Sequence, residues 1–310
     1  MFLSCGEALF DFFPSAETDS GFLFDARIGG SPFNVAVGLS RLGRGAALFT
    51  GLSSDPLGRR LERTLVDEGV DTTWLVRKQN QTTLALVGLD PSGVPQYTFY
   101  GHDTADSSVG EKDLPELPRS VVAIHFGSYS LVVEPTGSSL LRLAVQNHDA
   151  RLISFDPNPR LNIESDVGRW RRRVEEFSQI ADLIKVSEED LEMLFPGDDI
   201  ESAMSRWSSR GVQLIVVTRG HDGALVSLRG EHFEAPGSTV EVVDTVGAGD
   251  SFQAALLCGL DELGKATKPG IAEVTLDECR KIVDFAVAAA AMTCTRRGAD
   301  LPRRLDLPNL

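Results

Sequence analysis

Asp244-Thr245-Val246-Gly247-Ala248-Gly249-Asp250 is the stretch of this sequence that decides the fold. It follows a β-branched run, Thr239–Val243, which we expect to form a strand, and it opens a helix in which apolar residues recur at helical spacing up to Leu263. The small residues Gly247, Ala248 and Gly249 allow a ligand to approach the backbone closely. The first turn of a helix also has unpaired N–H groups and the positive end of the helix dipole. The stretch therefore predicts an anion site suited to a phosphate group.

Asp250 places a carboxylate inside this predicted anion site. A carboxylate beside a phosphate is electrostatically unfavourable unless it has a chemical role. The role that fits is to accept the proton of a hydroxyl group while its oxygen attacks the γ-phosphorus. In a plainer interpretation Asp250 only complements the helix dipole, but the Gly-Ala-Gly run favours the chemical role.

Outward from this stretch, apolar runs alternate with amphipathic ones along the chain. The expected strands are Phe2–Leu9, Ala46–Gly51, Val121–Phe126, Arg151–Phe155, Leu183–Val186 and Leu214–Thr218. The helical patterns between them include Asn34–Leu42, Gly58–Glu68 and Gly137–Asn147. Such alternation predicts an α/β fold with a mostly parallel sheet covered by helices on both faces.

Two regions interrupt this alternation. Gly21–Ile28 has the pattern of a short strand, and Thr82–Leu89 and Pro95–Tyr100 flank the turn signal Asp90–Gly93 as in a hairpin. These strands have few sequential neighbours with which to join a parallel sheet. We therefore expect a small separate sheet that acts as a lid over a cleft.

The C-terminal third contains the clearest helix signals. Gly264 is expected to end the helix that Asp250 opens. Thr275 and Glu278 have the spacing of a capping box before an Ala-rich helix that extends to about Arg297, and Gly298 is expected to be its C-terminal cap.

Bulk properties narrow the classes of function. The chain has 310 residues, is 42% apolar and has a formal net charge of −15, with a pI of about 4.8. An acidic surface repels nucleic acid, and we find neither a signal peptide nor an apolar run that could span a membrane. The cysteines, which show no metal-ligand spacing, are Cys5, Cys258, Cys279 and Cys294. We expect a cytoplasmic protein without disulfides.

Two more glycine-containing segments could contact ligands. Gly29-Gly30-Ser31-Pro32-Phe33-Asn34 either brings the Asn34 amide to a polyol or forms a tight turn with Asn34 near a helix cap. Thr218-Arg219-Gly220-His221-Asp222-Gly223 follows a strand, where ligands bind in doubly wound sheets. That segment either cradles a nucleotide or is a plain hairpin turn into Ala224–Arg229.

Together these segments resemble the ribokinase-like (PfkB) carbohydrate kinases over nearly the whole chain. Gly29–Asn34 is similar to the family's N-terminal signature, and Asp244–Asp250 is similar to its C-terminal signature. Several stretches resemble fructokinases most: Cys5–Asp11, Phe126–Ser128 with Ser130-Leu131 and Glu134-Pro135, Asp156–Arg160 and Thr293–Ala299. The resemblance implies a three-layer α/β/α doubly wound sheet in a single domain, 1–310, with a lid from about 10–30 and 82–106.

The resemblance also assigns roles to residues. Asp250 would be the catalytic base, and the anion hole would be Gly247, Ala248 and Gly249. The sugar would be held or lined by Asp11, Gly30, Asn34, Phe99 and Arg160. ATP would be contacted by Lys185, Ser187, Thr218, Gly220 and Gly223. Asp190 would position Mg²⁺ through water, and a monovalent cation such as K⁺ would lie by Asp244, Thr245 and Gly298.

Two positions depart from the family pattern. Ser187 and Asp190 stand where the family often has Asn-x-x-Glu, and Asp has a shorter reach than Glu. Val287 stands in place of an Asn near the adenine.

The expected reaction is phosphorylation of fructose by ATP. The alternative acceptors are 2-keto-3-deoxygluconate, ribose and a nucleoside, and a non-catalytic sugar-binding protein is a further alternative. A Rossmann dehydrogenase is disfavoured because no Gly-x-Gly-x-x-Gly follows the first strand. An exposed lid edge predicts a homodimer through the lids.

Overall fold

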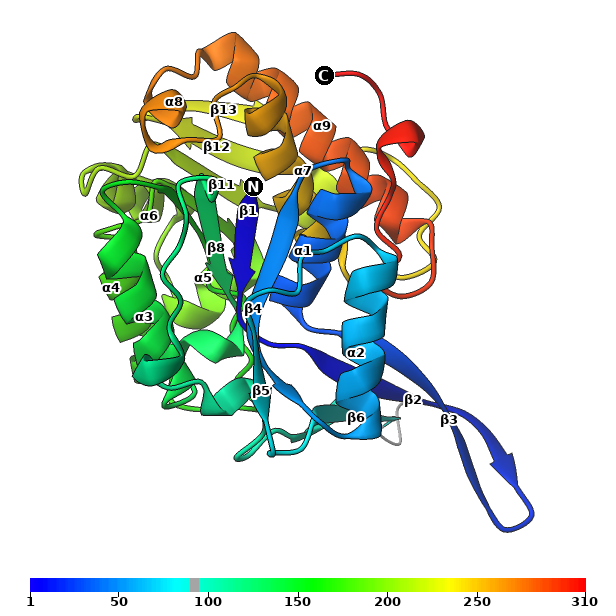
Figure 1. Ribbon diagram of the computed structural model, residues 1–310. Coiled ribbons are helices and arrows are strands. Elements are labelled where there is room, and N and C mark those ends of the chain that lie inside the picture. The colour runs from blue at the N-terminus through cyan, green and yellow to red at the C-terminus, as the bar shows by residue number, and fades with distance from the viewer. Residues whose placement is uncertain (90–94) are drawn as a thin grey trace.

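A large central sheet lies between helices on its two faces (Figure 1). The computed structural model describes residues 1–89 and 95–310. Within them the large sheet has nine strands in the order β13-β12-β11-β10-β9-β8-β1-β4-β5. Their bounds are β1 Phe2–Cys5, β4 Ala46–Ser53, β5 Leu75–Lys78, β8 Ala123–Gly127, β9 Leu152–Asp156, β10 Leu183–Ser187, β11 Leu214–Thr218, β12 Ala224–Leu228 and β13 Glu231–Ala235.

The strand pairings make this a doubly wound sheet. All neighbours from β11 to β5 are parallel, and only β12 and β13 at one edge are antiparallel. The chain leaves β1 first towards β4 and β5, and then returns on the other side of β1 to β8 and β9. Ligands bind at the carboxyl ends of strands beside such a reversal.

Helices cover both faces, as predicted. Successive strand residues point to opposite sides, so Leu3 and Ile124 pack in one core cluster while Phe2 and Ala123 pack in another. The first cluster is covered by α3 (Thr136–Asn147), α4 (Val167–Phe177), α5 (Glu188–Leu194) and α6 (Ile200–Ser208). The second is covered by α1 (Ser31–Arg41), α7 (Ala248–Glu262), α8 (Lys268–Ala272) and α9 (Leu276–Cys294). The helix α2 (Pro56–Asp67) packs on β4.

A small second sheet lies apart from the first, which confirms the prediction. Its strands are β2 (Leu9–Thr18), β3 (Gly21–Gly29), β6 (Thr83–Leu89) and β7 (Pro95–Tyr100), in the order β3-β2-β6-β7. The β2–β3 hairpin projects away from the body (Figure 1). The predicted turn Asp90–Gly93 lies outside the described residues, and the role of this sheet as a lid stays a prediction.

The prediction of one strand over Phe2–Leu9 is wrong. β1 ends at Cys5, and β2 begins at Leu9 in the other sheet. Gly6 has a φ of 146°, and a Cβ there would lie 2.4 Å from Pro32 Cγ. This sharp, close-packed turn sends the chain from the body into the small sheet.

Two predictions around the C-terminal signature also fail. Thr239–Val243 forms no strand: the N–H groups of Val243 and Asp244 donate to Cys294 O at 2.8 and 3.3 Å, at the end of a helix. The Ala-rich helix begins with the predicted capping box of Thr275 and Glu278 but ends at Cys294. Gly298 is therefore not its cap; with a φ of 71°, it turns the chain beyond the helix.

Two smaller features complete the fold. Gly264 follows the end of α7 with a φ of 69°, as expected for a helix stop. No helix in the described parts of the chain is both long enough and apolar enough to cross a membrane.

Candidate active site

Asp250 lies in the first turn of α7 and faces the first turn of α1. Its carboxylate accepts hydrogen bonds on both oxygens: Ser31 Oγ donates to Oδ1 at 2.6 Å, and Asn34 Nδ2 donates to Oδ2 at 2.8 Å. Residues from the two predicted signatures therefore meet, although they are 216 positions or more apart in the sequence. Asn34 and Asp250, predicted from separate segments, are therefore in direct contact.

The glycine-rich turn before α7 is closely packed at Gly247. Gly247, the N-cap residue, adopts the left-handed conformation with a φ of 81°, and a Cβ there would lie 2.7 Å from Ala299 Cβ. α7 is 15 residues long, and the positive end of its helix dipole lies at this turn. The predicted anion hole at Gly247, Ala248 and Gly249 thus has the backbone that such a site requires.

Lys185 lies beside the same turn, on β10. Its Nζ is 3.0 Å from where a Cβ on Gly249 would be, and it donates to Asp156 Oδ2 at 2.7 Å. Burial alone would lower the pKa of Lys185, but the carboxylates of Asp156, Asp190 and Asp250 raise it above its usual value. Burial raises the pKa of Asp156 to about 6, although Lys185 opposes the shift. The glycine turn before α7 therefore has a buried ammonium ion next to it.

The other predicted ATP residues lie at the carboxyl ends of β10 and β11. Ser187 and Thr218 are partners in the strand register, and Ser187 Oγ accepts from Asp190 N at 3.0 Å as the N-cap of α5. Gly220, with a φ of 55°, has open space where a Cβ would be. Gly223 is enclosed instead: a Cβ would lie 2.1 Å from Ala235 O, so close packing of the protein's own backbone explains this glycine.

The predicted sugar residues come from the small sheet, the start of α1 and the segment after β9. A Cβ on Gly29 would lie 2.4 Å from Asp11 Oδ2, so this glycine makes room for the Asp11 carboxylate. Gly30, with a φ of 105°, is the N-cap of α1. Burial raises the pKa of Asp11 to about 6, and the Arg160 guanidinium opposes this shift.

Phe99 lies at the side of this site on β7. Its ring centroid is 6.4 Å from that of Tyr129 in an edge-on arrangement. It thereby connects the small sheet to the body.

Of the three residues predicted for a monovalent cation, Asp244 and Gly298 are in contact. Asp244 accepts from Val246 N at 3.1 Å and from Gly298 N at 2.8 Å, which joins the two loops beside α7. Thr245 is exposed. The described residues contain no group of three or more His, Cys, Asp or Glu side chains placed to hold a metal ion.

Sequence reasoning missed Glu7 and Ser31. Glu7 is only 1% exposed; its Oε1 accepts from Ser31 N at 3.3 Å and its other oxygen accepts from Ser130 Oγ. Burial raises the pKa of Glu7 to about 7, against hydrogen bonds from Ser130 and Ser128, while Asp106 adds to the shift. A signal for Glu7 was available, because it is an acidic residue inside an otherwise apolar run.

The raised pKa of Glu7 predicts a pH dependence of stability. The protonated Glu7 carboxyl stabilises the folded protein. This stabilisation is fully present below about pH 4.5, the ordinary pKa of a glutamate, and is lost as the pH rises through about 7. We expect the free energy of unfolding of the natural protein to fall between about pH 6 and 8.5 by about 1 kcal/mol more than that of Glu7→Gln, which stays neutral. Denaturant unfolding at both pH values measures the difference. Parallel pH profiles for the two proteins would contradict the assignment.

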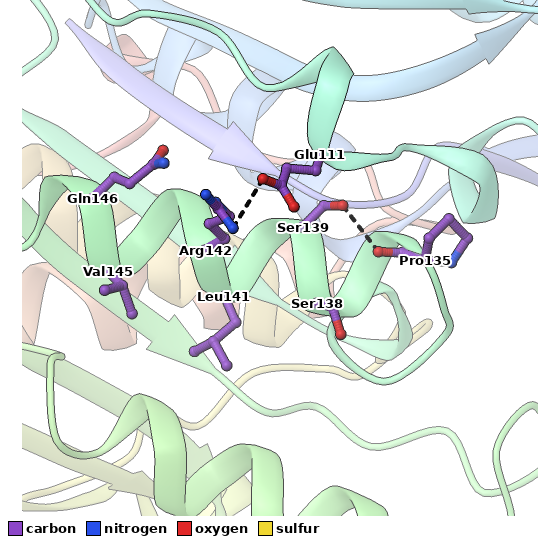
Figure 2. A pocket seen from close by; sticks show the side chains of 8 residues that line it. All are labelled: Glu111, Pro135, Ser138, Ser139, Leu141, Arg142, Val145 and Gln146. Carbon is purple, nitrogen blue, oxygen red and sulfur yellow. Dashed lines mark hydrogen bonds and ion pairs between the residues drawn. The ribbon is translucent and has the colours of Figure 1, made fainter.

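A hollow elsewhere on the surface is not part of this site (Figure 2). It is lined by side chains of α3 together with Glu111 and Pro135, and the ion pair between Arg142 and Glu111, at 2.9 Å, closes one side. None of the predicted site residues lines it.

Comparison with known proteins agrees with this geometry. The pattern of the pfkB family carbohydrate kinases matches residues 3–304. The fructokinase of Rhizobium leguminosarum bv. trifolii is 36% identical over 278 residues, which are 90% of this chain and 84% of that protein.

Solved structures agree as well. The fructokinase of Xylella fastidiosa with bound ATP superposes with a TM-score of 0.87 at 26% identity, over 96% of this chain and 93% of that one. A double mutant of the Vibrio cholerae O395 fructokinase, bound to fructose, ADP and a potassium ion, gives 0.82 at 29% identity, again over 96% and 93%. The fold is thus the predicted ribokinase-like one, and the chain belongs to the pfkB family of carbohydrate kinases, which are phosphotransferases acting on a sugar hydroxyl.

Proposed function

We propose that this enzyme transfers the γ-phosphate of ATP to a hydroxyl group of fructose, giving fructose 6-phosphate, with Asp250 as the catalytic base. The observation that carries the proposal is the position of the Asp250 carboxylate. It lies in the first turn of α7, next to the glycine turn on one side and to Asn34 on the other. A base placed between a phosphate site and a polyol site is what transfer to a sugar requires.

On the phosphate side, catalysis would rest on positioning and on positive charge. The N–H groups of the α7 first turn would point at the transferred phosphoryl group from Gly247, Ala248 and Gly249. The Lys185 ammonium, beside Gly249, would offset its negative charge. The remaining ATP contacts are proposed for Ser187, Thr218, Gly220 and Gly223.

On the sugar side, hydrogen-bonding groups would hold the acceptor. Asp11, Gly30 and Asn34 would bind sugar hydroxyls, with Phe99 and Arg160 lining the site. Asp250 would accept the acceptor proton as the oxygen bonds to the γ-phosphorus and ADP leaves. An aliphatic hydroxyl is a far weaker acid than a carboxylic acid, so the proton would move only as the new bond forms. Closure of the small sheet as a lid would exclude water.

The cations are also proposals. Mg²⁺ is held in kinase sites by one or two carboxylates and the substrate phosphates. Asp190, at the start of α5 and close enough to influence the pKa of Asp156, is the carboxylate that fits. The magnesium ion would neutralise charge on the phosphates. A K⁺ ion would lie by Asp244, Thr245 and Gly298, where two loops already meet.

Fructose is favoured over an acidic sugar by the charge near the site. The Arg160 guanidinium is offset by Asp11, whose pKa it influences. A substrate carboxylate would therefore meet a repelling carboxylate rather than a free cation. The fructokinase relatives and solved structures likewise favour fructose over the alternative acceptors 2-keto-3-deoxygluconate, ribose and a nucleoside.

The acceptor can be tested by ADP release. We expect kcat/KM for fructose to exceed that for ribose, adenosine and 2-keto-3-deoxygluconate by at least about tenfold, since a site that hydrogen-bonds several hydroxyls rejects analogues that lack them. The assay couples ADP formation to NADH oxidation at fixed ATP and Mg²⁺. A higher kcat/KM for 2-keto-3-deoxygluconate would overturn the acceptor but not the chemistry.

Two properties of the whole protein complete the proposal. We propose a homodimer through the small sheets, because Phe22, Leu23 and Phe24 at the end of the projecting hairpin are 70%, 54% and 42% exposed. We also propose that the enzyme works in the cytoplasm, where free cysteines such as Cys5 and Cys258 stay reduced.

A further inference from the structure

The Asp250 carboxylate is fixed by two donors from one face of α1. Ser31 and Asn34 are three positions apart in the first turn of that helix, so their side chains project to the same side. They are 7% and 8% exposed, so these hydrogen bonds are shielded from water. A carboxylate has a broad terminal torsion, and two donors on different oxygens restrict it to one orientation.

The two donors differ in what happens when the sugar binds. Asn34 is itself proposed to hold a sugar hydroxyl, so its amide would be shared between the sugar and Asp250. Ser31 has no such second task, and its hydroxyl donates to Oδ1 at 2.6 Å, the shorter of the two distances. Ser31 would therefore be the donor that still holds the carboxylate in the reacting complex.

The position of Ser31 is in turn fixed from outside the helix. The N-cap of α1 is Gly30, which has no side chain to bond the free N–H groups of the first turn. Glu7 takes over part of this task by accepting from Ser31 N, and Ser130 holds Glu7. A Cβ on Gly30 would lie 2.7 Å from Glu7 O, so the two segments are in close contact.

We propose that Ser31 is a positioning residue for catalysis: its hydroxyl holds the Asp250 carboxylate in the orientation that receives the acceptor proton. This inference rests on the proposed function, because it assumes that Asp250 is the base. The proposed role requires no contact of Ser31 with the sugar or the phosphate. Its loss therefore lowers kcat and leaves both KM values nearly unchanged.

The test compares Ser31→Ala with Ser40→Ala. Ser40 lies near the other end of α1, and its Oγ donates to Glu68 O at 2.6 Å, so the control removes an equally short hydrogen bond from the same helix. We expect Ser31→Ala to lower kcat about 10- to 100-fold, the effect of a misplaced catalytic group. KM for ATP and for fructose should stay within about threefold, since no binding contact is lost. Ser40→Ala should keep the natural kcat.

A second measurement separates positioning from a general structural role. Ser31→Ala is placed in an Asp250→Asn background, and the residual turnover is followed with radiolabelled ATP. If Ser31 acts through the carboxylate, it has no further effect there, because residues that act as a unit are not additive. An equal loss in both backgrounds would assign Ser31 to packing and overturn the inference.

The remaining outcomes distinguish the inference from the function on which it rests. A natural kcat in Ser31→Ala together with an inactive Asp250→Asn would overturn the role of Ser31 alone. Natural turnover in Asp250→Asn would overturn the base assignment, and the positioning role with it.

Discussion

Asp250→Asn is expected to lower kcat by about 10²- to 10⁴-fold, the range that general-base catalysis supplies. The amide cannot accept the acceptor proton, whereas the surrounding hydrogen bonds can persist. Its oxygen can still accept from Ser31 Oγ, and the Asn34 amide can rotate to present its oxygen to the new NH₂ group. The fold should therefore be retained and the chemical step lost.

Binding measurements make this prediction specific to the chemistry. Calorimetry should show sugar affinity within a few-fold of the natural protein. ATP affinity should be equal or higher, because a negative charge next to the phosphate site has been removed. Asp261→Asn is a matched control at the far end of α7, where the carboxylate pairs with Arg44 at 3.0 Å and is partly exposed. Natural turnover in Asp250→Asn, or equal losses in both variants, would contradict the role of Asp250.

The alternation of strands and helices could be predicted because buried parallel strands are short apolar runs. Leu214–Thr218 is one such run, and it coincides with β11. Prediction failed where a local pattern was overruled by contacts with distant segments. The β-branched Thr239–Val243 pairs with no strand in the described residues, and Val243 N donates to the end of α9 instead. The strand Leu75–Lys78 was missed because it lies at the sheet edge, where Arg77 and Lys78 break the apolar run.

The site could be predicted only as far as single segments carry a pattern. Asp250 and the glycines before it stand out in the sequence because small residues and an acidic residue occur together at the start of a predicted helix. Ser31 does not stand out, since its partner is 219 positions away and a serine at a helix start is common. The enclosure of Gly223 by Ala235 likewise depends on the pairing of β12 with β13, which no local sequence pattern predicted.

The Lys185–Asp156 pair has a structural task besides its proposed catalytic one. The two side chains are 5% and 2% exposed, so both charges are out of water. Asp156 Oδ1 has no hydrogen-bond partner, so Lys185 is what compensates this carboxylate in the described part of the chain. A buried charge without compensation is strongly destabilising.

Lys185→Met is therefore expected to lower the free energy of unfolding by about 3–5 kcal/mol, the cost of breaking a buried pair on one side. Turnover should also fall, because the ammonium beside Gly249 is lost. Chemical denaturation and the coupled ADP assay measure the two effects. A stability within about 0.5 kcal/mol of the natural protein, the usual range for surface substitutions, would contradict the pairing.

The double variant Lys185→Met/Asp156→Leu separates these two effects. Replacing both members of a buried ion pair by hydrophobic residues of similar volume is often neutral or stabilising, so most of the lost stability should return while turnover stays low. Restored turnover would show that Lys185 serves only to neutralise Asp156.

The pH dependence of stability gives an independent check. Asp156 titrates at about 6 in the natural protein, and without Lys185 burial raises this pKa further. In the natural protein, the free energy of unfolding falls with rising pH until the Asp156 carboxyl is ionised at about pH 6. In Lys185→Met this carboxyl ionises at a higher pH, so the free energy of unfolding continues to fall above about pH 6. The stability deficit of the single variant should therefore grow from about pH 6 to 8, and that of the double variant should stay constant.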